Sequence, residues 1–488
     1  MQFEQWPLAR PPFRAQAEAI RRGWDRDGFN FYMEQGLGKS ATTLANYEIL
    51  RRKGEVRKLL IVSPNSFKAG WVSEIKKAGI SVPIAVWSPD RRDRFLKTVR
   101  EEKEWIAIVN YESLAKLADD YVKIVTGQDV MIAADESIKL KNPKSLQSRA
   151  ALFLGDHCGM QRNLSGKPVT QGPHDLWAQL KFIRRVKKMN FYAFRNQFCQ
   201  MGGYLGKQVV GARNEEEMQA LLNSCSFLAR KKDWTDLPAK LDPITVPVDM
   251  VGDQRSMYKE MEKEFIASLS EKELVAVEQA ITRDIKLRQI MSGFIMDEEG
   301  NVREFMPFKK NPRFKATVEL LEDTIDGKAV VVTWYKHTMD SLLFHFGEMG
   351  YNPAFIRGRM KDDEIEEQKR RFNEDDDCRV IVVQQVAAKY GHTLLGTPRV
   401  PCSSMIFFEQ SYSLDDRSQI EDRIHRYGQV WPCSYFDFAM SRLDRACVRA
   451  LQRKESVAAA VLGYRNLEDN QKLQAHAIDD ALAIAFAA

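Results

Sequence analysis

FNFYMEQGLGKSATTLANYEILRR, residues 29–52, contains a strand signal, a glycine-rich turn and a helix signal in direct succession. FNFYM is a short apolar run, ATTLANYEILRR has the character of a helix, and EQGLGKS at 34–40 joins the two. A glycine-rich turn between a strand and a helix brings backbone N–H groups and a helix N-terminus to a phosphate chain. The stretch therefore predicts an α/β domain that binds a nucleotide.

Individual residues of this turn match the chemistry of phosphate binding. Gly36 and Gly38 let the backbone approach the phosphates, Lys39 reaches the β- and γ-phosphates, and the Ser40 hydroxyl can ligate Mg²⁺. The strict phosphate-loop pattern has a further glycine where this chain has Met33. A chance surface turn is the alternative, and the flanking strand and helix favour the phosphate loop.

An acidic pair follows a second apolar run, in VMIAADESIKLKN at 130–142. Asp135 would hold Mg²⁺, and Glu136 would orient or deprotonate the attacking water. An isolated pair of this kind is more often the cap of a helix. The phosphate loop, which we expect one strand earlier in the same sheet, favours the catalytic interpretation.

A distant segment, QIEDRIHRYGQ at 419–429, carries two arginines that suit the same site. Gln419, Arg423 and Arg426 have the i, i+4, i+7 spacing of one helical face, with His425 turned away from it. Two guanidiniums can meet the charge that develops as a γ-phosphate departs, as an arginine finger does. We assign Gln419 to nucleotide binding and both arginines to catalysis.

Short apolar runs alternate with longer helix-like segments twice along the chain, a pattern typical of parallel sheets with crossover helices. We expect strands at 29–33, 59–63, 105–110, 130–135 and 163–166, and again at 329–334, 352–357, 379–384, 405–410 and 434–440. Residues 175–310 show no strand signal apart from the proline-spaced 237–248. The pattern predicts a first lobe at 1–235 with a helical protrusion from about 175, a helical insertion and linker at 236–310, a second lobe at 311–454 and a helical tail at 455–488.

Composition bounds the class of protein. A chain of 488 residues can form two to four domains. The net charge of +6 is too mild to indicate a nucleic-acid partner by itself, and the seven cysteines, without a CxxC pair, favour a reducing compartment over a disulfide framework or a zinc ribbon. The N-terminal residues do not resemble a signal peptide, and no apolar segment reaches membrane-spanning length. We expect a cytoplasmic protein with no membrane contact.

Several ordered blocks make the chain resemble the Swi/Snf-type ATPases of helicase superfamily two, which are DNA translocases with paired RecA-like lobes. The blocks run from about Phe13 to about Tyr435 and are FRAQAEAI, EQGLGKS, LLIVSPNSFKAGW, NYESL, DESIKLKN, LSGKPVTQGPHDLWAQLKFI, LRQIMSGF, TWYKH, YGHTL and QIEDRIHRYGQ. The resemblance implies the fold class α/β with two RecA-like parallel-sheet lobes in tandem and helical insertions between them. It also implies ATP and Mg²⁺ as cofactors, with Gln16 reading adenine.

The resemblance further implies a DNA track between the lobes, contacted through phosphate and sugar. The expected contacts are Ser63, Lys68, Asn110, Thr333, Lys336 and Thr393. A basic stretch, KFIRRVKKMN at 181–190, adds Lys181, Arg184, Arg185, Lys187 and Lys188. Such a cluster can neutralise phosphates, and a solvated helix face explains its charge equally well. Binding through these groups would be sequence-tolerant and salt-sensitive.

Four positions depart from the family pattern. Ile138 stands where many members have histidine, and Lys167 replaces a threonine of the segment that couples ATP to DNA. Gln384 and Gln385 replace serine or threonine in the second lobe. The residues expected to hydrolyse ATP are all present, so these changes concern how tightly hydrolysis is coupled to movement.

These features predict an ATP-dependent double-stranded DNA translocase that remodels DNA or protein-DNA complexes in replication, repair or recombination. Its size suits a bacterial cell or a virus-infected one better than a nucleus, and a recruiting protein is not identified. One alternative is a strand-separating helicase acting on DNA or RNA. Another is a non-enzymatic, ATP-gated clamp that binds nucleic acid or a host protein.

Overall fold

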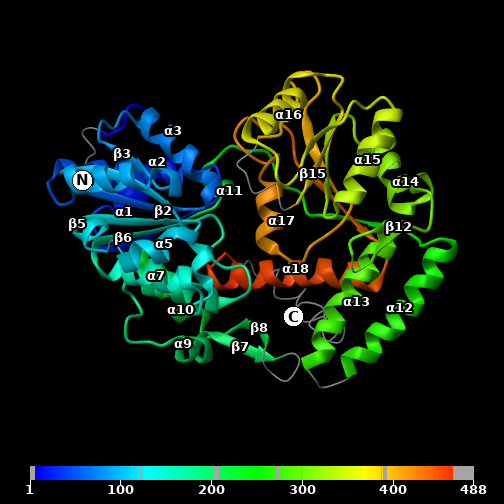
Figure 1. Cartoon of the computed structure of the whole chain (residues 1–488), viewed down its shortest axis with the longest axis horizontal. Helices are drawn as coiled ribbons and strands as arrows, with labels where there is room; N and C mark the ends of the chain where they lie inside the picture. Colours follow the sequence, from blue (N-terminus) through cyan, green and yellow to red (C-terminus); the bar gives the residue numbers. More distant parts are fainter. Residues whose placement is uncertain are drawn as a thin grey trace. The chain divides into compact units, whose positions relative to one another are not determined.

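The computed structural model describes residues 6–464 except 121, 203–207, 271–273, 298, 386 and 388–392. The described residues form two compact units. The first runs to Asp236 and includes 454–464, and the second is Leu237–Arg453. Each unit is an α/β layer structure built on one parallel sheet (Figure 1).

The sheet of the first unit has the strand order β3-β4-β2-β5-β6-β1-β9, and every pairing in it is parallel. Its strands are β1 Gly28–Met33, β2 Lys58–Ser63, β3 Ile84–Val86, β4 Trp105–Asn110, β5 Gly127–Asp135, β6 Cys158–Ser165 and β9 Ser226–Ala229. Successive side chains enter opposite cores, as Leu59 and Leu60 do in β2. Both faces are therefore buried, which explains the continuous apolar runs in the sequence.

Helices cover both faces of this sheet. They are α1 Arg14–Gly23, α2 Lys39–Arg52, α3 Lys68–Ala78, α4 Arg92–Glu101, α5 Leu114–Asp120, α6 Val122–Val125, α7 Leu146–Asp156, α8 Leu176–Phe182, α9 Phe191–Phe198, α10 Glu215–Cys225 and α11 Lys231–Trp234. α1, α2 and α3 share one core, and α5, α7 and α8 share the other. A small antiparallel pair, β7 Cys199–Gly202 and β8 Gln208–Ala212, follows α9.

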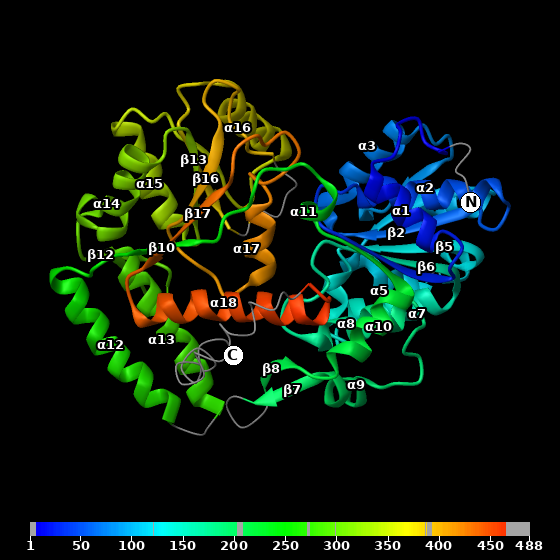
Figure 2. The ribbon, with the colours of Figure 1, turned by 180° about the vertical axis from the view of Figure 1, so that it is seen from behind.

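The second unit repeats the design with the strand order β10-β17-β16-β13-β15-β14, again all parallel. Its strands are β10 Ile244–Pro247, β13 Lys328–Thr333, β14 Ala354–Ile356, β15 Val380–Gln384, β16 Cys402–Phe407 and β17 Ser434–Ala439. Figure 2 shows β10 at the edge beside β17. An edge position suits the proline-spaced sequence, because proline has no N–H to donate and an edge strand pairs on one side only.

Helices α14 Pro312–Glu319, α15 Lys336–Glu348, α16 Asp362–Glu374 and α17 Leu414–Glu421 connect these strands. The long helices α12 Gly252–Ser270 and α13 Leu274–Ser292 and the hairpin β11 Phe294–Met296 and β12 Val302–Glu304 come before them. Helix α18 Arg442–Val461 ends the described chain. Its residues through Arg453 belong to the second unit, and those from Lys454 to the first.

The predicted fold class, two parallel α/β lobes in tandem, is confirmed. All the predicted strands are present, but the sequence analysis saw only the end of β6 and missed β3. It also predicted no strand in 175–310 apart from 237–248, and this is wrong, because β7, β8, β9, β11 and β12 lie there. The reason for the error at β6 is that Gln161, Arg162 and Asn163 are fully buried in the middle of that strand. Polar residues are stable there because their side chains hydrogen-bond to neighbouring elements.

Arg162 is the clearest of these polar core residues. Its guanidinium donates to Asn46 Oδ1 at 2.6 Å and to the carbonyls of Asp27, Gln161, Gly23 and Trp24. Burial lowers the pKa of this group to about 9. The side chain therefore ties the end of α1 and the middle of α2 to β6.

Replacing Arg162 with alanine is expected to lower the free energy of unfolding by about 3 kcal/mol or more, measured by urea unfolding. The change removes the donor to the buried Asn46 Oδ1 and the bonds that join α1 to β6, and it opens a cavity. The matched control is Arg22→Ala, because Arg22 lies on α1 but is half-exposed in a surface pair with Glu18. Its effect should stay within about 0.5 kcal/mol. Equal losses in the two variants would contradict the structural role of Arg162.

Candidate active site

The phosphate-loop candidate lies between β1 and α2 in the first unit. Gly36 and Gly38 have φ of 89° and 81°, a left-handed conformation that favours glycine. A side chain on Gly38 would also collide with Gln16, since its Cβ would lie 1.9 Å from that amide nitrogen. Lys39 begins α2 and donates from Nζ to the Met33 carbonyl at 3.0 Å. The loop thus has the backbone of a phosphate cradle at a helix N-terminus.

Gln16 lies beside this loop, on α1. Its Oε1 accepts from the Phe13 N–H at 2.8 Å, and its Nε2 donates to the Gly38 carbonyl at 3.4 Å. The side chain is buried. This placement at the loop is compatible with adenine reading, which stays a prediction.

The acidic pair lies at the end of β5. Both carboxylates are buried, and Glu136 has φ of 49°. Asp135 accepts the Glu136 N–H on Oδ1 at 3.0 Å and the Trp71 indole N–H on Oδ2 at 2.9 Å, while the Tyr111 hydroxyl donates to its carbonyl at 2.8 Å. Burial raises the pKa of Asp135, and the charge of Lys39 and the Trp71 hydrogen bond oppose that shift. Asp135 is thus within electrostatic reach of the phosphate-loop lysine.

The expected neighbour relation of these two strands needs a correction. β5 and β1 are not adjacent, because β6 lies between them in the order β5-β6-β1. The segment that follows β6 therefore passes beside the phosphate loop. A Cβ on Gly166 would lie 3.5 Å from Lys39 Nζ and 3.4 Å from the Gln35 nitrogen. The predicted coupling segment is thus in place next to the loop.

A hydrogen-bonded serine lies next to Ile138, the position where many family members have histidine. Ile138 is buried, and the neighbouring Ser137 hydroxyl donates to Gln179 Oε1 on α8 at 2.9 Å. Gln179 Nε2 in turn donates to the carbonyl of Asp175, whose carboxylate accepts from the Thr170 N–H and hydroxyl. A polar connection from the acidic pair to the coupling segment therefore exists, one residue earlier than the family pattern places it.

The predicted arginine face in the second unit is wrong in its geometry. Gln419 lies on α17, where its amide donates to Asp415, but the helix ends at Glu421. Arg423 and Arg426 lie in the turn that follows, so they do not share a helical face with Gln419.

Contacts after α17 hold this turn. The Arg423 carbonyl accepts the Leu394 N–H at 3.0 Å, and the Gln429 amide donates to the Cys402 and Ile424 carbonyls. Gly428 has φ of 98°, which a helix does not allow. Arg423 is buried and Arg426 half-buried, and burial lowers the pKa of Arg426. That both arginines meet the triphosphate stays a prediction.

The candidate nucleic-acid contacts of the first unit gather at two adjacent strand ends. Ser63 ends β2 and pairs in register with Asn110, which ends β4. Lys68, at the start of α3, donates from Nζ to Asn110 Oδ1 at 3.4 Å and to the Trp87 carbonyl at 2.8 Å. The structure brings these three residues together, and their contact with DNA stays a prediction.

The basic stretch at 181–190 lies elsewhere on the first unit. The sequence analysis offered a solvated helix face as the other explanation of this charge. That explanation is wrong, because α8 ends at Phe182 and residues 183–188 form a turn. Arg184 has φ of 65° and donates to the carbonyls of Gly155, Asp156 and Cys158. These contacts lie at the start of β6, so they are at the opposite end of the strands from the phosphate loop. They give Arg184 a structural role.

Three other basic residues of this stretch also contact nearby groups of the first unit. Lys181 lies over the Trp177 ring at 4.9 Å, Arg185 donates to the Gly28 carbonyl at 3.4 Å, and Lys187 pairs with Asp156 at 3.9 Å. Lys188 is exposed. A contact of these groups with DNA stays a prediction, and it would lie apart from the Ser63, Lys68 and Asn110 cluster.

In the second unit, two of the three candidate nucleic-acid contacts lie at or just after the end of a strand. Thr333 ends β13 and is buried, and Lys336 begins α15. Thr393 is half-buried, and its carbonyl accepts from Asn373 at 2.8 Å, whereas residues 390–392 of the YGHTL block lie outside the described residues. Trp334, the residue after Thr333, is 37% exposed.

Gln384, one of the departures from the family pattern, connects three of these strand ends. Its Oε1 accepts the Gly358 N–H at 3.1 Å beyond β14, and its Nε2 donates to the Trp334 carbonyl at 3.2 Å beyond β13. A serine or threonine side chain is too short for both bonds.

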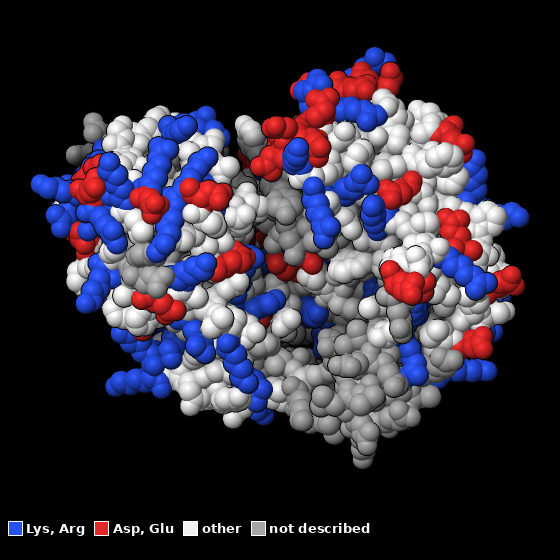
Figure 3. Space-filling view, in the orientation of Figure 1, with Lys and Arg blue, Asp and Glu red and all other residues white. Residues whose placement is uncertain are grey.

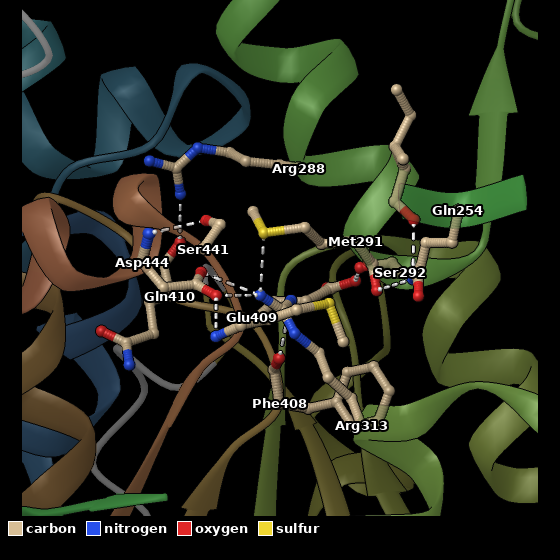
Figure 4. A network of polar contacts seen from close by, with 12 residues as sticks. Gln254, Arg288, Met291, Ser292, Arg313, Phe408, Glu409, Gln410, Ser441 and Asp444 are labelled. Carbon is tan, nitrogen blue, oxygen red and sulfur yellow. Dashed lines mark hydrogen bonds and ion pairs between the residues drawn. The ribbon is translucent and has the colours of Figure 1, made fainter. Parts of the chain in front are cut away.

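Sequence reasoning missed a buried carboxylate in this unit. Glu409 follows β16 and accepts the Trp334 and Tyr335 N–H groups at the start of α15 and the hydroxyls of Thr338 and Ser292. Figure 4 shows it close to Ser292 at the end of α13. The missed signal is the acid that ends the apolar run MIFFEQ, because a buried acid needs several donors.

A buried ion pair lies close to Glu409 in the same unit. Arg313 at the start of α14 pairs with Asp444 at the start of α18 at 2.8 Å and donates to the Phe408 carbonyl at 3.2 Å (Figure 4). These contacts join α14, α18 and the end of β16 within the second unit.

Two absences hold for the described residues. They contain no group of three or more His, Cys, Asp and Glu side chains able to bind a metal ion. The part of the chain that the structure describes has no helix long and apolar enough to cross a membrane.

Comparison with known families agrees with this geometry. Residues 31–297 match the SNF2-related domain, and residues 312–428 match the Helicase conserved C-terminal domain. The chain therefore belongs to the SNF2-related family, the Snf2-type ATPases of helicase superfamily two, and its two units are RecA-like lobes.

Individual relatives are distant. The chain is 24% identical over 431 residues to the SWI/SNF-related matrix-associated actin-dependent regulator of chromatin subfamily A-like protein 1 of Xenopus tropicalis, covering 83% of this chain and 41% of that protein. It is 26% identical to protein p41 of Acyrthosiphon pisum secondary endosymbiont phage 1, covering 81% and 84%. It is 23% identical to the DNA annealing helicase and endonuclease ZRANB3 of Mus musculus, covering 91% and 39%. The chain thus spans less than half the length of the Xenopus tropicalis and Mus musculus relatives.

The match with one solved structure covers nearly the whole of both chains. The Sulfolobus solfataricus SWI2/SNF2 ATPase core in complex with dsDNA covers 99% of both chains at 19% identity, with a TM-score of 0.45.

Proposed function

We propose that this protein is an ATP-dependent double-stranded DNA translocase that couples Mg²⁺-dependent ATP hydrolysis to movement along DNA. The observation that carries the proposal is the meeting, within one unit, of the phosphate loop, the buried Asp135 and Glu136 pair and the segment after β6. Family membership supports ATP as the nucleotide and DNA as the polymer.

The residues of the first lobe have separate tasks in this mechanism. The loop amides and Lys39 bind the phosphates, and Gln16 contacts the adenine. Asp135 and Ser40 would hold Mg²⁺, which when bound would supply positive charge near the departing phosphate. Glu136 orients the attacking water and takes its proton. Burial of both carboxylates keeps solvent from screening these interactions.

The second lobe completes the cycle in our proposal. Arg423 and Arg426 stabilise the transition state, and Gln419 contacts the nucleotide. ATP then favours a closed arrangement of the lobes, because it binds that arrangement more tightly, and hydrolysis releases it. If both lobes grip one strand of a duplex, repeated closure advances the protein in inchworm steps.

DNA contact would be made through the backbone of the duplex. The predicted contacts at the ends of β2 and β4 include one lysine and two neutral polar residues, which suit phosphate and sugar. On the face in Figure 3, basic side chains are interspersed with acidic ones over both units. The mild net charge of +6 favours a local track over binding by a large basic surface.

Duplex DNA is expected to raise ATP turnover by about tenfold, within the usual range of allosteric coupling. The test compares phosphate release with duplex, forked, single-stranded DNA and RNA, for the native chain and Lys39→Ala. DNA affinity should fall steeply with salt and depend little on base sequence. If none of these nucleic acids changes ATP turnover, the protein is not a DNA translocase.

The same ligand series separates the main alternatives. Greater stimulation by RNA, or strand separation of a tailed duplex, would favour a helicase. Tight ATP binding without sustained turnover would favour the clamp, against which the intact acidic pair argues. The similarity to a phage protein supports a role in bacterial or infected cells, and the cytoplasm is our proposed compartment.

A further inference from the structure

The Asp135 residue receives hydrogen bonds from two aromatic side chains that the proposed chemistry does not use. The Trp71 indole N–H reaches Oδ2 at 2.9 Å, and the Tyr111 hydroxyl reaches the backbone carbonyl at 2.8 Å. Both aromatic side chains are buried. One bond orients the carboxylate, and the other holds the end of the strand that carries it.

Each aromatic residue belongs to a segment that begins with a proposed DNA contact. Lys68 and Trp71 are three residues apart on α3, which places them one turn apart on that helix. Asn110 and Tyr111 are consecutive, at the junction of β4 and the following turn. Lys68 Nζ and Asn110 Oδ1 lie 3.4 Å apart, so the two segments also contact each other. A ligand at Lys68 or Asn110 would therefore bind the same segments that carry the two donors of Asp135.

The carboxylate is sensitive to such movement. Its Oδ1 accepts the Glu136 N–H and its Oδ2 accepts the indole N–H, so the plane of the group is defined by one donor on each oxygen. A Mg²⁺ ion would use the remaining lone pairs, and their direction follows from that plane. Loss of a partner that orients a metal ligand typically changes metal affinity or activity by about 10- to 100-fold.

We propose that Trp71 and Tyr111 are positioning residues that transmit DNA binding from the ends of β2 and β4 to Asp135. The inference rests on the proposed DNA-stimulated ATPase and names the route of its stimulation. DNA at Lys68 and Asn110 fixes α3 and the turn after β4, which fixes both donors and sets the carboxylate for catalysis. Without DNA these donors are less firmly held, and hydrolysis is slow.

The chain offers matched controls for both residues. Tyr32 and Trp105 are buried in the same unit, and neither the Tyr32 hydroxyl nor the Trp105 indole nitrogen has a hydrogen-bond partner among the described residues. Tyr32→Phe and Trp105→Phe therefore repeat the chemical change and leave the donors of Asp135 intact. Tyr111→Phe and Trp71→Phe each remove one donor.

The experiment measures the ratio of ATP turnover with and without duplex DNA for the four variants and the native chain. We expect Tyr111→Phe and Trp71→Phe to lower this ratio by about tenfold, as for other orienting partners, at unchanged affinity for the duplex by fluorescence anisotropy. The control variants should retain the native ratio. A purely structural role would lower stability and turnover with and without DNA together and leave the ratio unchanged.

A second measurement avoids turnover. In the Glu136→Gln variant, which should not hydrolyse ATP, the affinity for a fluorescent ATP analogue is measured with and without duplex DNA. We expect the duplex to change this affinity, and we expect the change to vanish when Tyr111→Phe is added. Stimulation of the native chain with equal ratios in all variants would overturn this inference and leave the proposed function standing. A native chain that DNA does not stimulate would overturn both.

Discussion

Replacing Glu136 with glutamine is expected to reduce the ATP turnover number by about 100- to 10,000-fold, the usual contribution of a general base. Glutamine has nearly the same shape, so it preserves packing at a buried position with φ of 49°. It cannot accept the proton of the attacking water. Phosphate release at saturating ATP and duplex DNA measures the effect.

Binding measurements separate this chemical defect from misfolding. The variant should still bind a fluorescent ATP analogue, because Lys39 and the loop amides are unchanged. The matched control is Glu55→Gln, an exposed acid just after α2, and it should have native turnover. Full turnover by the Glu136 variant would show that this carboxylate is not the base and would favour a different group for water activation.

The strand and loop that carry the phosphate site were predictable because local signals coincide there. A buried parallel strand must be apolar on both faces, and the left-handed residues before α2 favour glycine, so 29–52 contains strand, turn and helix signals without conflict. The acidic pair was predictable for the same reason, since it follows another apolar run.

Elements whose stability comes from distant partners were not predictable. β6 is polar in its middle, and its burial depends on acceptors from α1 and α2 that no local window contains. The arrangement of β6 between β5 and β1 is a property of topology and is likewise invisible along the sequence. β9 is only four residues long and pairs with β1 across nearly two hundred residues.

The arginine segment shows how a periodic pattern can mislead. QIEDRIHRYGQ has helical spacing, but the helix ends at Glu421 because later residues bond to other parts of the lobe, such as Leu394 and Cys402. Trp71 gives the opposite lesson. Its burial was predictable from its type, but its role as a donor to Asp135 depends on where α3 packs.

Replacing Arg426 or Arg423 with alanine is expected to lower turnover by about 1,000- to 100,000-fold, the range of arginine fingers. In our proposal the guanidinium meets charge on the γ-phosphate only in the transition state, so ATP and DNA binding should persist. Lysine at either position should restore little, because it lacks the planar fork. The matched control is Arg399→Ala, an exposed arginine of the same unit.

The burial of Arg423 makes a folding control necessary, so both variants are also compared with the native chain by thermal unfolding. A mixing experiment then decides how the two lobes cooperate. Lys39→Ala keeps its arginines and Arg426→Ala keeps its phosphate loop, so each lacks a different half of the proposed site. If one chain provides both halves, the mixture stays inactive. Recovery of turnover on mixing would show that the arginines act on a neighbouring copy, and an Arg426 variant with native turnover would exclude the finger altogether.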